Sequence, residues 1–490
     1  MASDPNLTSL TLAEAREGLL KRDFSSAELV RATLDRIDET EPRVQACLHV
    51  LRDKALADAA ALDGAGPDRS KPLWGLPVTV KDVFLVRGAP TTAGSRMLSG
   101  YMPGFEAGVV TRLRAAGAVI TAKTNLDEFA MGSSTEFSAF RPTRNPWNLS
   151  RVPGGSSGGA AAGISARQAP GAFGTDTGGS IRQPAALCGC VGLKPTYGRV
   201  SRYGIVAYGS SLDQAGPLAR TVGDCGMLFG AVAGPDGRDS TSSRVPLEDL
   251  SAMTPPEASK LRFALPRELW EGRFDTEVEK VLSSARRVME SAGIRLEAVS
   301  MPSIRYSVAA YYVIAAAEAS TNLARYDGVR YGLRAPGRGD LLSLYRESRT
   351  EGLGPEARRR ILLGTFALSS GYYDAYYRKA AQVRRLIHEE YARILGEFDF
   401  ILAPVSSIPA WPFGSFTDDP LTQYQLDVMT LPLNLAGGPG LSLPAGLGAD
   451  GLPVGIQIQG PHFREKPLLE AGMLLESMFP RLPEPAFVSG

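Results

Sequence analysis

Short β-prone runs alternate with helical stretches along most of this 490-residue chain. Strands are predicted at 77–80 and 119–122, and 191–193 is a weaker candidate. Each run is too short to stand alone, and helical patterns surround it. The alternation predicts an α/β fold in which a central mixed β-sheet has helices on both faces.

The N-terminal segment carries two helix-start signals. Thr11 to Glu14 and Ser25 to Glu28 both match the capping box, in which a hydroxyl and a carboxylate satisfy free backbone N–H groups. These signals predict helices at roughly 12–22 and 26–40. We therefore expect an N-terminal helical hairpin.

The second half repeats the α/β pattern. After residue 250 a strand, a helix and a strand are predicted at 261–265, about 276–291 and 294–299. Helical stretches at 307–325 and 356–395 precede late strands at 398–403 and 454–459. We expect these late strands to rejoin the first sheet in a single domain over 1–490. Its expected parts are a helical region (1–70), a core (71–235), an embedded subregion (250–400) and C-terminal strands (400–490).

Composition excludes several classes of protein. The chain has 53 Lys and Arg against 52 Asp and Glu, and this net charge of +1 gives no electrostatic footprint for direct nucleic-acid binding. Its four cysteines form no CxxC pair, which predicts reduced thiols and neither a metal site nor a disulfide framework. No run of 18 apolar residues occurs, and Met1 to Pro5 carry no secretion signal. We expect a cytoplasmic protein without membrane contact.

The segment Gly154 to Gly159 offers two candidate nucleophiles, Ser156 and Ser157. Gly/Ser-rich segments are often only flexible loops. This one also fits G-x-S-x-G twice, as in the nucleophile elbow of α/β-hydrolases. That elbow needs a strand directly before it, and the prolines of 145–153 argue against one. It also needs His388 or His462 as its base. His388 is predicted on a helix and His462 in a loop, positions more typical of structural or surface histidines than of a catalytic base.

A second glycine cluster surrounds Ser180. Consecutive glycines let backbone N–H groups converge on one point. The amides of Thr177, Gly178, Gly179 and Ser180 are therefore a candidate oxyanion hole for attack by Ser180 on a carbonyl. A simple tight turn before a helix explains the cluster equally well when it is considered alone.

Lys81 is the candidate base in a chain with only three histidines. Most lysines are solvated surface charges. Lys81, however, closes the apolar strand predicted at 77–80, so its amine is expected to be buried. A lysine acts as a base only when neutral, which requires burial to lower its pKa by roughly three units from about 10.4.

Together these residues resemble the amidase signature family. The resemblance implies the amidase signature fold and a catalytic triad in which Ser180 is the nucleophile and Lys81 the general base and acid. Ser156 then relays the proton and follows a cis peptide bond. Ser133, Asp176 and Arg182 also match family positions and are expected to organise the site.

Longer stretches resemble one branch of this family, the A subunits of bacterial glutamyl/aspartyl-tRNA amidotransferases. The stretches are 192–202, 211–218, 318–332 and 363–377. The resemblance implies glutamine as the substrate, with Arg360 and Asp427 holding its α-carboxylate and α-ammonium groups and Tyr311 lining the pocket. Arg360 lies in a run of three arginines, which alone is more typical of a solvated helix face.

The resemblance further implies a heterotrimer with B and C subunits. In it, ammonia from glutamine passes to the B subunit, which uses ATP and Mg²⁺ to amidate glutamate or aspartate on mischarged tRNA. No P-loop motif occurs in this chain, so no cofactor or metal is expected to bind it directly. Two alternatives are a stand-alone amidase acting on small or aryl amides and a non-catalytic assembly protein.

Overall fold

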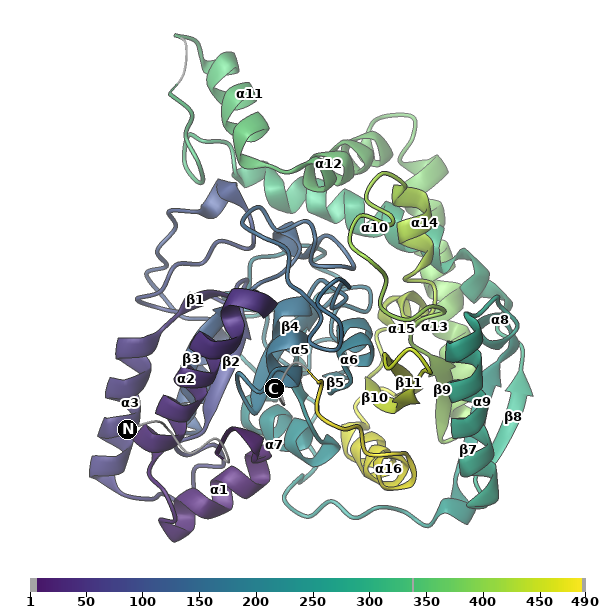
Figure 1. The fold of residues 1–490 in the computed structure, drawn as a ribbon. Coiled ribbons are helices and arrows are strands. Elements are labelled where there is room, and N and C mark those ends of the chain that lie inside the picture. Colours follow the sequence, from purple (N-terminus) through teal and green to yellow (C-terminus); the bar gives the residue numbers. More distant parts are fainter. Residues whose placement is uncertain (1–6, 337–338, 487–490) are drawn as a thin grey trace.

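The computed structural model describes residues 7–336 and 339–486, and its centre is one eleven-stranded mixed sheet (Figure 1). The strand order is β1-β3-β2-β4-β6-β5-β10-β11-β9-β7-β8. Helices flank the sheet, so the predicted α/β class is confirmed. The absence of a secretion signal concerns Met1 to Pro5, which lie outside the described residues. The division into four parts stays a prediction.

The strands, in chain order, are β1 (Cys47–Val50), β2 (Pro77–Lys81), β3 (Val119–Thr124), β4 (Gly171–Asp176), β5 (Val191–Lys194), β6 (Gln214–Ala219), β7 (Arg262–Pro266), β8 (Arg295–Val299), β9 (Phe400–Pro404), β10 (Gly440–Leu447) and β11 (Pro453–Gln459). Strand β2 pairs in parallel with β3 and β4, and β7 with β8 and β9. The other pairs are antiparallel. The C-terminal strand β10 pairs with β5, so segments far apart in sequence share one sheet.

The helices are α1 (Leu12–Lys21), α2 (Ser26–Val44), α3 (Arg52–Ala65), α4 (Gly108–Ala115), α5 (Gly158–Ser165), α6 (Arg182–Cys188), α7 (Val222–Val232), α8 (Arg267–Trp270), α9 (Thr276–Ser291), α10 (Ser307–Asn322), α11 (Leu341–Gly352), α12 (Pro355–Leu368), α13 (Lys379–Glu397), α14 (Pro420–Gln425), α15 (Leu431–Ala436) and α16 (Glu465–Met478). Both predicted capping boxes form, at Thr11 and Ser25, and start α1 and α2. Among the described residues, no helix combines the length and apolar character that crossing a bilayer requires.

Some sequence predictions need correction. The helix predicted at 356–395 is interrupted: α12 ends at Leu368, Gly371 adopts a positive φ, and a π-helical turn (Asp374–Arg378) precedes α13. Strands β1, β4, β6 and β10 were not predicted. The last three contain glycine or proline, which usually weaken a strand. In β4, a Cβ at Gly174 would lie 2.7 Å from the Ser157 Oγ, so close packing explains the glycine.

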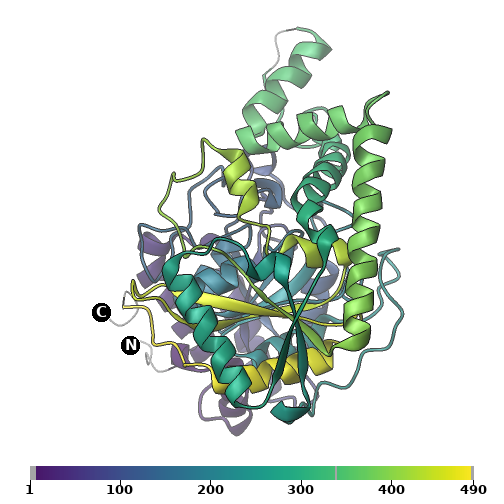
Figure 2. The same cartoon turned by 90° about the vertical axis from the view of Figure 1, so that its right-hand side faces the viewer.

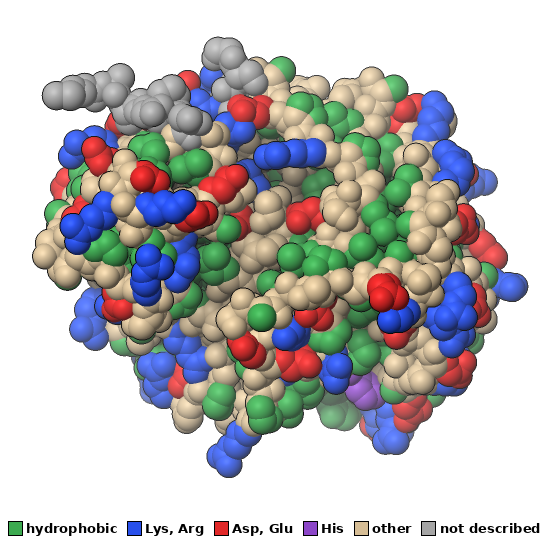
Figure 3. Space-filling view, turned by 90° about the horizontal axis from the view of Figure 1, so that it is seen from below, with side chains coloured by type: hydrophobic (Ala, Val, Ile, Leu, Met, Phe, Trp, Pro, Cys, Tyr) green, Lys and Arg blue, Asp and Glu red, His purple; other side chains and the backbone are tan. Residues whose placement is uncertain are grey.

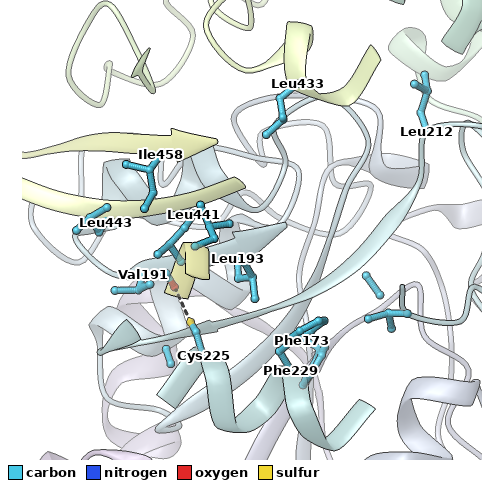
Figure 4. Close-up of a cluster of buried hydrophobic side chains, with 14 of the residues drawn as sticks. Phe173, Val191, Leu193, Leu212, Cys225, Phe229, Leu433, Leu441, Leu443 and Ile458 are labelled. Atoms are coloured by element: carbon cyan, nitrogen blue, oxygen red, sulfur yellow. Dashed lines mark hydrogen bonds between the residues drawn. The ribbon is translucent and has the colours of Figure 1, made fainter. Parts of the chain in front are cut away.

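The two faces of the sheet bury separate cores. Ala172 in β4 packs in a cluster with residues of α5 and α6. The next residue, Phe173, points to the opposite face and packs with Phe229 of α7 (Figure 4). Helix α16 also packs on α7 and β10. Helices α5 and α6 therefore cover one face, and α7 and α16 cover the other.

The ends of β2 and β4 position the candidate site. Parallel neighbours have their carboxyl ends at the same edge of a sheet, which is where α/β proteins commonly bind ligands. Strand β2 ends at Lys81 and β4 ends at Asp176. The segment from Thr177 to Ile181 then leads into α6. The topology therefore brings the two sequence motifs together.

A helical layer extends from the sheet on the side of α10. Helix α10 packs against α12 and α13, and α11 projects farthest from the body (Figures 1 and 2). The face of the molecule shown in Figure 3 has charges of both signs interspersed among apolar side chains. That distribution agrees with the net charge of +1.

Candidate active site

Lys81 is fully buried at the end of β2. Its Nζ lies 2.7 Å from the Ser156 Oγ, 3.0 Å from the Ser157 Oγ and 2.9 Å from the Thr175 Oγ1. Burial lowers the pKa of the Lys81 amine to about 7, against the opposing charge of Asp127. A substantial fraction of the amine is thus neutral at neutral pH, as a lysine base requires.

The hydrogen bonds distinguish Ser156 from Ser157. The Ser157 hydroxyl donates to the carbonyl oxygen of Thr175 at 3.1 Å, so its proton is committed to the backbone. The Ser156 hydroxyl has one hydrogen-bond partner among the described residues, the Lys81 amine. When the lysine is neutral, Ser156 can therefore donate to its lone pair while Ser157 accepts an N–H from Nζ.

The two glycine clusters are in direct contact. The Gly155–Ser156 peptide bond is cis, as the family resemblance implies. The next N–H, that of Ser157, donates to the carbonyl oxygen of Ser180 at 3.1 Å. The Ser180 hydroxyl makes no hydrogen bond to the described residues, and the residue is 8% exposed. The Ser180 backbone thus lies against the Ser156–Ser157 segment, and its hydroxyl has no hydrogen-bond partner among the described residues.

Asp176 and Arg182 hold the Ser180 loop in shape. The Asp176 carboxylate accepts the N–H groups of Gly179 at 2.8 Å and Ile181 at 3.2 Å. The Arg182 guanidinium donates to both carboxylate oxygens, from Nε at 3.0 Å and from a terminal nitrogen at 3.2 Å. Burial would raise the pKa of Asp176, but Arg182 brings it down to about 2. The pair is a scaffold under the nucleophile.

The predicted oxyanion hole at Thr177 to Ser180 stays a prediction. The Gly179 N–H donates to the Asp176 carboxylate at 2.8 Å. The amides of Thr177, Gly178 and Ser180 donate to no described side chain. A Cβ at Gly178 would lie 2.6 Å from the Tyr311 hydroxyl oxygen, so only glycine fits there. The same contact places Tyr311 directly against the loop.

Arg360 is buried, whereas its run of three arginines alone is more typical of a solvated helix face. It is 4% exposed, whereas Arg358 and Arg359 are exposed. Its Nε donates to the Glu356 Oε1 at 2.7 Å and a terminal nitrogen donates to the Tyr208 hydroxyl at 2.6 Å. The guanidinium carbon also lies 5.0 to 5.6 Å from three tyrosine ring centroids, those of Tyr208, Tyr312 and Tyr424. Helix α12 therefore turns one of its three arginines inward.

Tyr312 contacts both Asp427 and Arg360 and so connects the two charged residues. The Asp427 carboxylate accepts the Tyr312 hydroxyl at 2.8 Å and the Ser133 hydroxyl at 2.7 Å. The ring of Tyr312 meanwhile lies under the Arg360 guanidinium. Burial raises the pKa of Asp427 to about 6, partly offset by the two hydroxyls. One tyrosine thus contacts an anion and a cation, and its neighbour Tyr311 contacts the nucleophile loop.

Several site residues were not predicted from the sequence. Thr430 donates its hydroxyl to the Gly178 carbonyl at 2.6 Å, and Asn434 donates to the Asp176 carboxylate at 2.8 Å. Tyr208, Tyr312 and Glu356 form the surroundings of Arg360. These residues are scattered over more than 200 positions and carry no local motif. Thr175 did carry a signal, because it directly precedes Asp176 in the second glycine cluster.

His388 and His462 take no part in this site. His388 Nδ1 and His462 Nε2 both lie within hydrogen-bond distance of the Ala436 carbonyl oxygen, at 2.9 and 3.0 Å. Neither contacts a serine, and no strand directly precedes Gly154. Both observations disfavour the nucleophile-elbow alternative. Among the described residues, no group of three or more His, Cys, Asp or Glu is placed to hold a metal ion.

Comparisons with known proteins agree with this geometry. The sequence model of the amidase family matches residues 28–469. The A subunit of glutamyl-tRNA(Gln) amidotransferase from Nitratidesulfovibrio vulgaris (strain DP4) is 55% identical over 483 residues, covering 98% of this chain and 99% of that protein. The crystal structure of the Thermotoga maritima protein of the same name is 40% identical, with a TM-score of 0.80 over 99% of this chain and 100% of that one. A native peptide amidase from Stenotrophomonas maltophilia is 30% identical, with a TM-score of 0.82 over 99% of this chain and 100% of that one. The chain therefore belongs to the amidase family.

Proposed function

We propose that this chain hydrolyses glutamine and supplies the ammonia as the A subunit of a glutamyl-tRNA(Gln)/aspartyl-tRNA(Asn) amidotransferase. The observation that carries the proposal is the buried Lys81–Ser156 contact of 2.7 Å beside a free Ser180 hydroxyl. A relative at 55% identity bears the name of an amidotransferase A subunit, which supports the choice among amidases. The buried Arg360 and Asp427 supply opposite charges that suit a zwitterionic amino acid.

The reaction begins when Ser180 Oγ attacks the side-chain amide carbon of glutamine. Its proton passes to Ser156, and the Ser156 proton passes to the neutral Lys81 amine. The negative charge on the carbonyl oxygen is stabilised by the free amides around Gly178. The proton then returns through Ser156 to the leaving nitrogen, the C–N bond breaks, and ammonia leaves. Water attacks the resulting ester on Ser180 and releases glutamate.

The substrate pocket orients glutamine by its two charges. Arg360 pairs with the α-carboxylate and Asp427 with the α-ammonium group, while Tyr311 borders the space next to Gly178. Glu356 and the tyrosine rings fix the Arg360 guanidinium before the substrate arrives, which reduces the entropy lost on binding. This arrangement directs the side-chain amide toward Ser180.

The remaining steps belong to partner subunits. The ammonia passes to a B subunit that uses ATP and Mg²⁺ to activate glutamate or aspartate on mischarged tRNA, and a C subunit braces the heterotrimer. The near-neutral charge of this chain supports tRNA binding mainly through the B subunit. The sequence contains no P-loop, which supports placing ATP on the partner.

A stand-alone amidase is the second candidate, because a peptide amidase shares the fold at 30% identity. The test is ammonia release from glutamine, a peptide amide and an aryl amide, each measured with and without the B and C subunits. The proposal predicts that glutamine is preferred and that its turnover rises with the partners. Brisk turnover of the other amides without partners, and none of glutamine, refutes it.

A further inference from the structure

Glu128 is a buried carboxylate at the start of α12. The residue is 2% exposed. Its Oε2 accepts the N–H of Gly354, which directly precedes α12, at 2.8 Å. Its Oε1 accepts the Ser95 hydroxyl at 2.5 Å. The N–H groups at a helix start have no partner within the helix and carry partial positive charge, so a carboxylate there anchors the helix.

The turn between α11 and α12 packs closely against the segment around Ser95. The Ser95 hydroxyl also lies 3.1 Å from the carbonyl oxygen of Gly352, the last residue of α11. A Cβ at Gly352 would lie 2.7 Å from the Met97 side chain. A Cβ at Gly354 would collide with the Glu128 carboxylate. Both glycines permit this close approach, and the start of α12 is therefore held at a defined place.

Helix α12 carries the residue proposed to bind the substrate carboxylate. Arg360 lies six residues after Gly354, which is about 9 Å along the helix axis. A shift of the helix start would move the guanidinium relative to the rings of Tyr312 and Tyr424. Pairing between a guanidinium and a carboxylate depends on direction as well as on distance. The anchor at Gly354 can therefore affect substrate binding through Arg360.

The turn that bears Glu128 also supports the opposite charge of the pocket. Phe129 and Ala130 have φ values of 51° and 61°, which residues other than glycine rarely adopt. Such backbone persists only when the surrounding contacts hold it. Three residues after Ala130, Ser133 donates its hydroxyl to the Asp427 carboxylate at 2.7 Å. One constrained turn thus contacts both α12 and the carboxylate proposed for the α-ammonium group.

We propose that Glu128 is a positioning residue for the α-carboxylate of glutamine, because it fixes the start of α12 and with it the direction of the Arg360 guanidinium. The inference rests on the proposed function for the identity of the substrate. Among the described residues, the hydrogen-bond partners of the Glu128 carboxylate are Ser95 and Gly354. Loss of the anchor should therefore raise KM and leave kcat nearly unchanged, since it weakens binding without touching the reacting atoms.

The test is steady-state glutamine hydrolysis by the full-length chain with the B and C subunits at about pH 8. Burial raises the pKa of Glu128 to about 7, so its carboxyl group is mostly ionised at that pH. We expect Glu128→Ala to raise KM about three- to tenfold, as the loss of one hydrogen bond would, with kcat within about twofold of the wild type. Glu128→Gln keeps an oxygen for the Gly354 N–H and gains an amide that can donate to the Ser95 hydroxyl. It should therefore restore most of the affinity.

Asp224 provides a matched control at another helix start. Its buried carboxylate accepts the N–H groups of Leu12 at 3.1 Å and Ala13 at 3.0 Å, the first two residues of α1. Asp224→Ala removes the same kind of anchor from a helix that carries none of the proposed site residues. This variant should have a lower melting temperature and an unchanged KM for glutamine.

An unchanged KM in folded Glu128→Ala overturns the inference and leaves the proposed function standing, because Glu128 is then only a structural contact. A fall in kcat at unchanged KM, or an equal rise of KM in Asp224→Ala, overturns it as well. If Glu128→Ala does not fold, Glu128→Asp decides. That variant keeps the charge but is too short to reach both Ser95 and Gly354, so KM should still rise, and an unchanged KM refutes the role. A wild type that turns over no glutamine refutes both the proposed function and the role of Glu128.

Discussion

Lys81 Nζ and Ser156 Oγ lie 2.7 Å apart in a fully buried part of the molecule, with Ser157 and Thr175 occupying the other hydrogen-bonding positions of the amine. Three partners match the three hydrogen bonds that a neutral amine makes, two as a donor and one as an acceptor. The Ser157 proton is committed to the Thr175 carbonyl oxygen, so Ser157 only accepts from the amine, whereas Ser156 can donate to the lone pair. The contact between Lys81 and Ser156 is therefore a path along which a proton can move.

The pH dependence of turnover should reflect the Lys81 amine, whose pKa burial lowers to about 7. The neutral amine is the active form, so kcat for glutamine is expected to rise as pH increases through about 7 and then level off. A pH series of ammonia release at saturating glutamine checks this. A flat profile between about pH 6 and 8 contradicts the role of Lys81.

The two buried lysines Lys81 and Lys123 should differ in their effect on the free energy of unfolding. The folded pKa of Lys81 is below the unfolded value of 10.5, so the unfolded chain binds more protons between about pH 7 and 10.5. Stability from this residue therefore grows as pH rises through that window. We expect Lys81→Met to abolish activity and to melt at least as high as the wild type at about pH 7.

Lys123→Met is the contrasting variant. Lys123 is also fully buried, but its Nζ pairs with the Asp82 carboxylate at 2.5 Å. Removing the lysine leaves a buried carboxylate unpaired, which costs about 3 to 5 kcal/mol of unfolding free energy. Denaturant unfolding of the two variants compares them. Equal losses of stability contradict the distinct environments described for the two lysines.

Substrate affinity should fall at acid pH because of Asp427. Burial raises the pKa of this carboxyl to about 6, and its hydrogen bond from Ser133 holds it down. KM for glutamine is expected to rise as pH falls through about 6, since the neutral acid no longer attracts the α-ammonium group. Ser133→Ala should move this transition to higher pH. Initial rates over a glutamine and pH grid separate this effect on KM from that of Lys81 on kcat.

Arg360 and Arg358 provide a matched pair on one helix. Arg360→Ala should raise KM for glutamine by roughly 10- to 100-fold, because a charge-assisted hydrogen bond is worth about 1.5 to 3 kcal/mol. Arg358→Ala, on the exposed face, should leave KM unchanged. Steady-state kinetics of both variants checks this. Similar KM values for the two variants contradict the placement of the carboxylate at Arg360.

Substituting each of the two adjacent serines should distinguish the proton relay, Ser156, from the residue with a structural role, Ser157. Ser156→Ala removes the proton path and is expected to reduce kcat about 100- to 10,000-fold. Ser157→Ala removes one acceptor of the Lys81 amine but leaves the path intact, so a smaller loss is expected. Single-turnover ammonia release compares the two. A larger loss in Ser157→Ala reverses the assignment.

Local patterns predicted the parts of this site that lie within one segment. Lys81 ends an apolar run, and Ser180 lies in a glycine cluster, so the sequence pointed to both. Burial of Arg360 was not visible in its run of arginines, because the tyrosines that surround it come from other parts of the chain. The engagement of Gly179 by Asp176 depends on loop geometry, which the sequence does not specify.

In the fold, too, the features set by one local segment were predicted and those set by distant parts of the chain were not. Strand β2 was predicted from its apolar run, and α1 and α2 from their capping boxes. Strands β4, β6 and β10, each of which contains glycine or proline, were missed. Gly216 in β6 has a physical reason: a Cβ there would collide with the Leu193 carbonyl oxygen of the neighbouring strand. The constraint comes from a strand pairing that is distant in sequence.

Ammonia release by Ser180→Ala, with the B and C subunits present and glutamine saturating, tests the central claim most directly. The control is correct folding of the variant, checked by its melting temperature and by its affinity for the partners. Without the Ser180 hydroxyl no acyl-enzyme can form, so turnover is predicted to fall to background while the complex still assembles. Retained glutamine turnover in a folded Ser180→Ala complex contradicts the account.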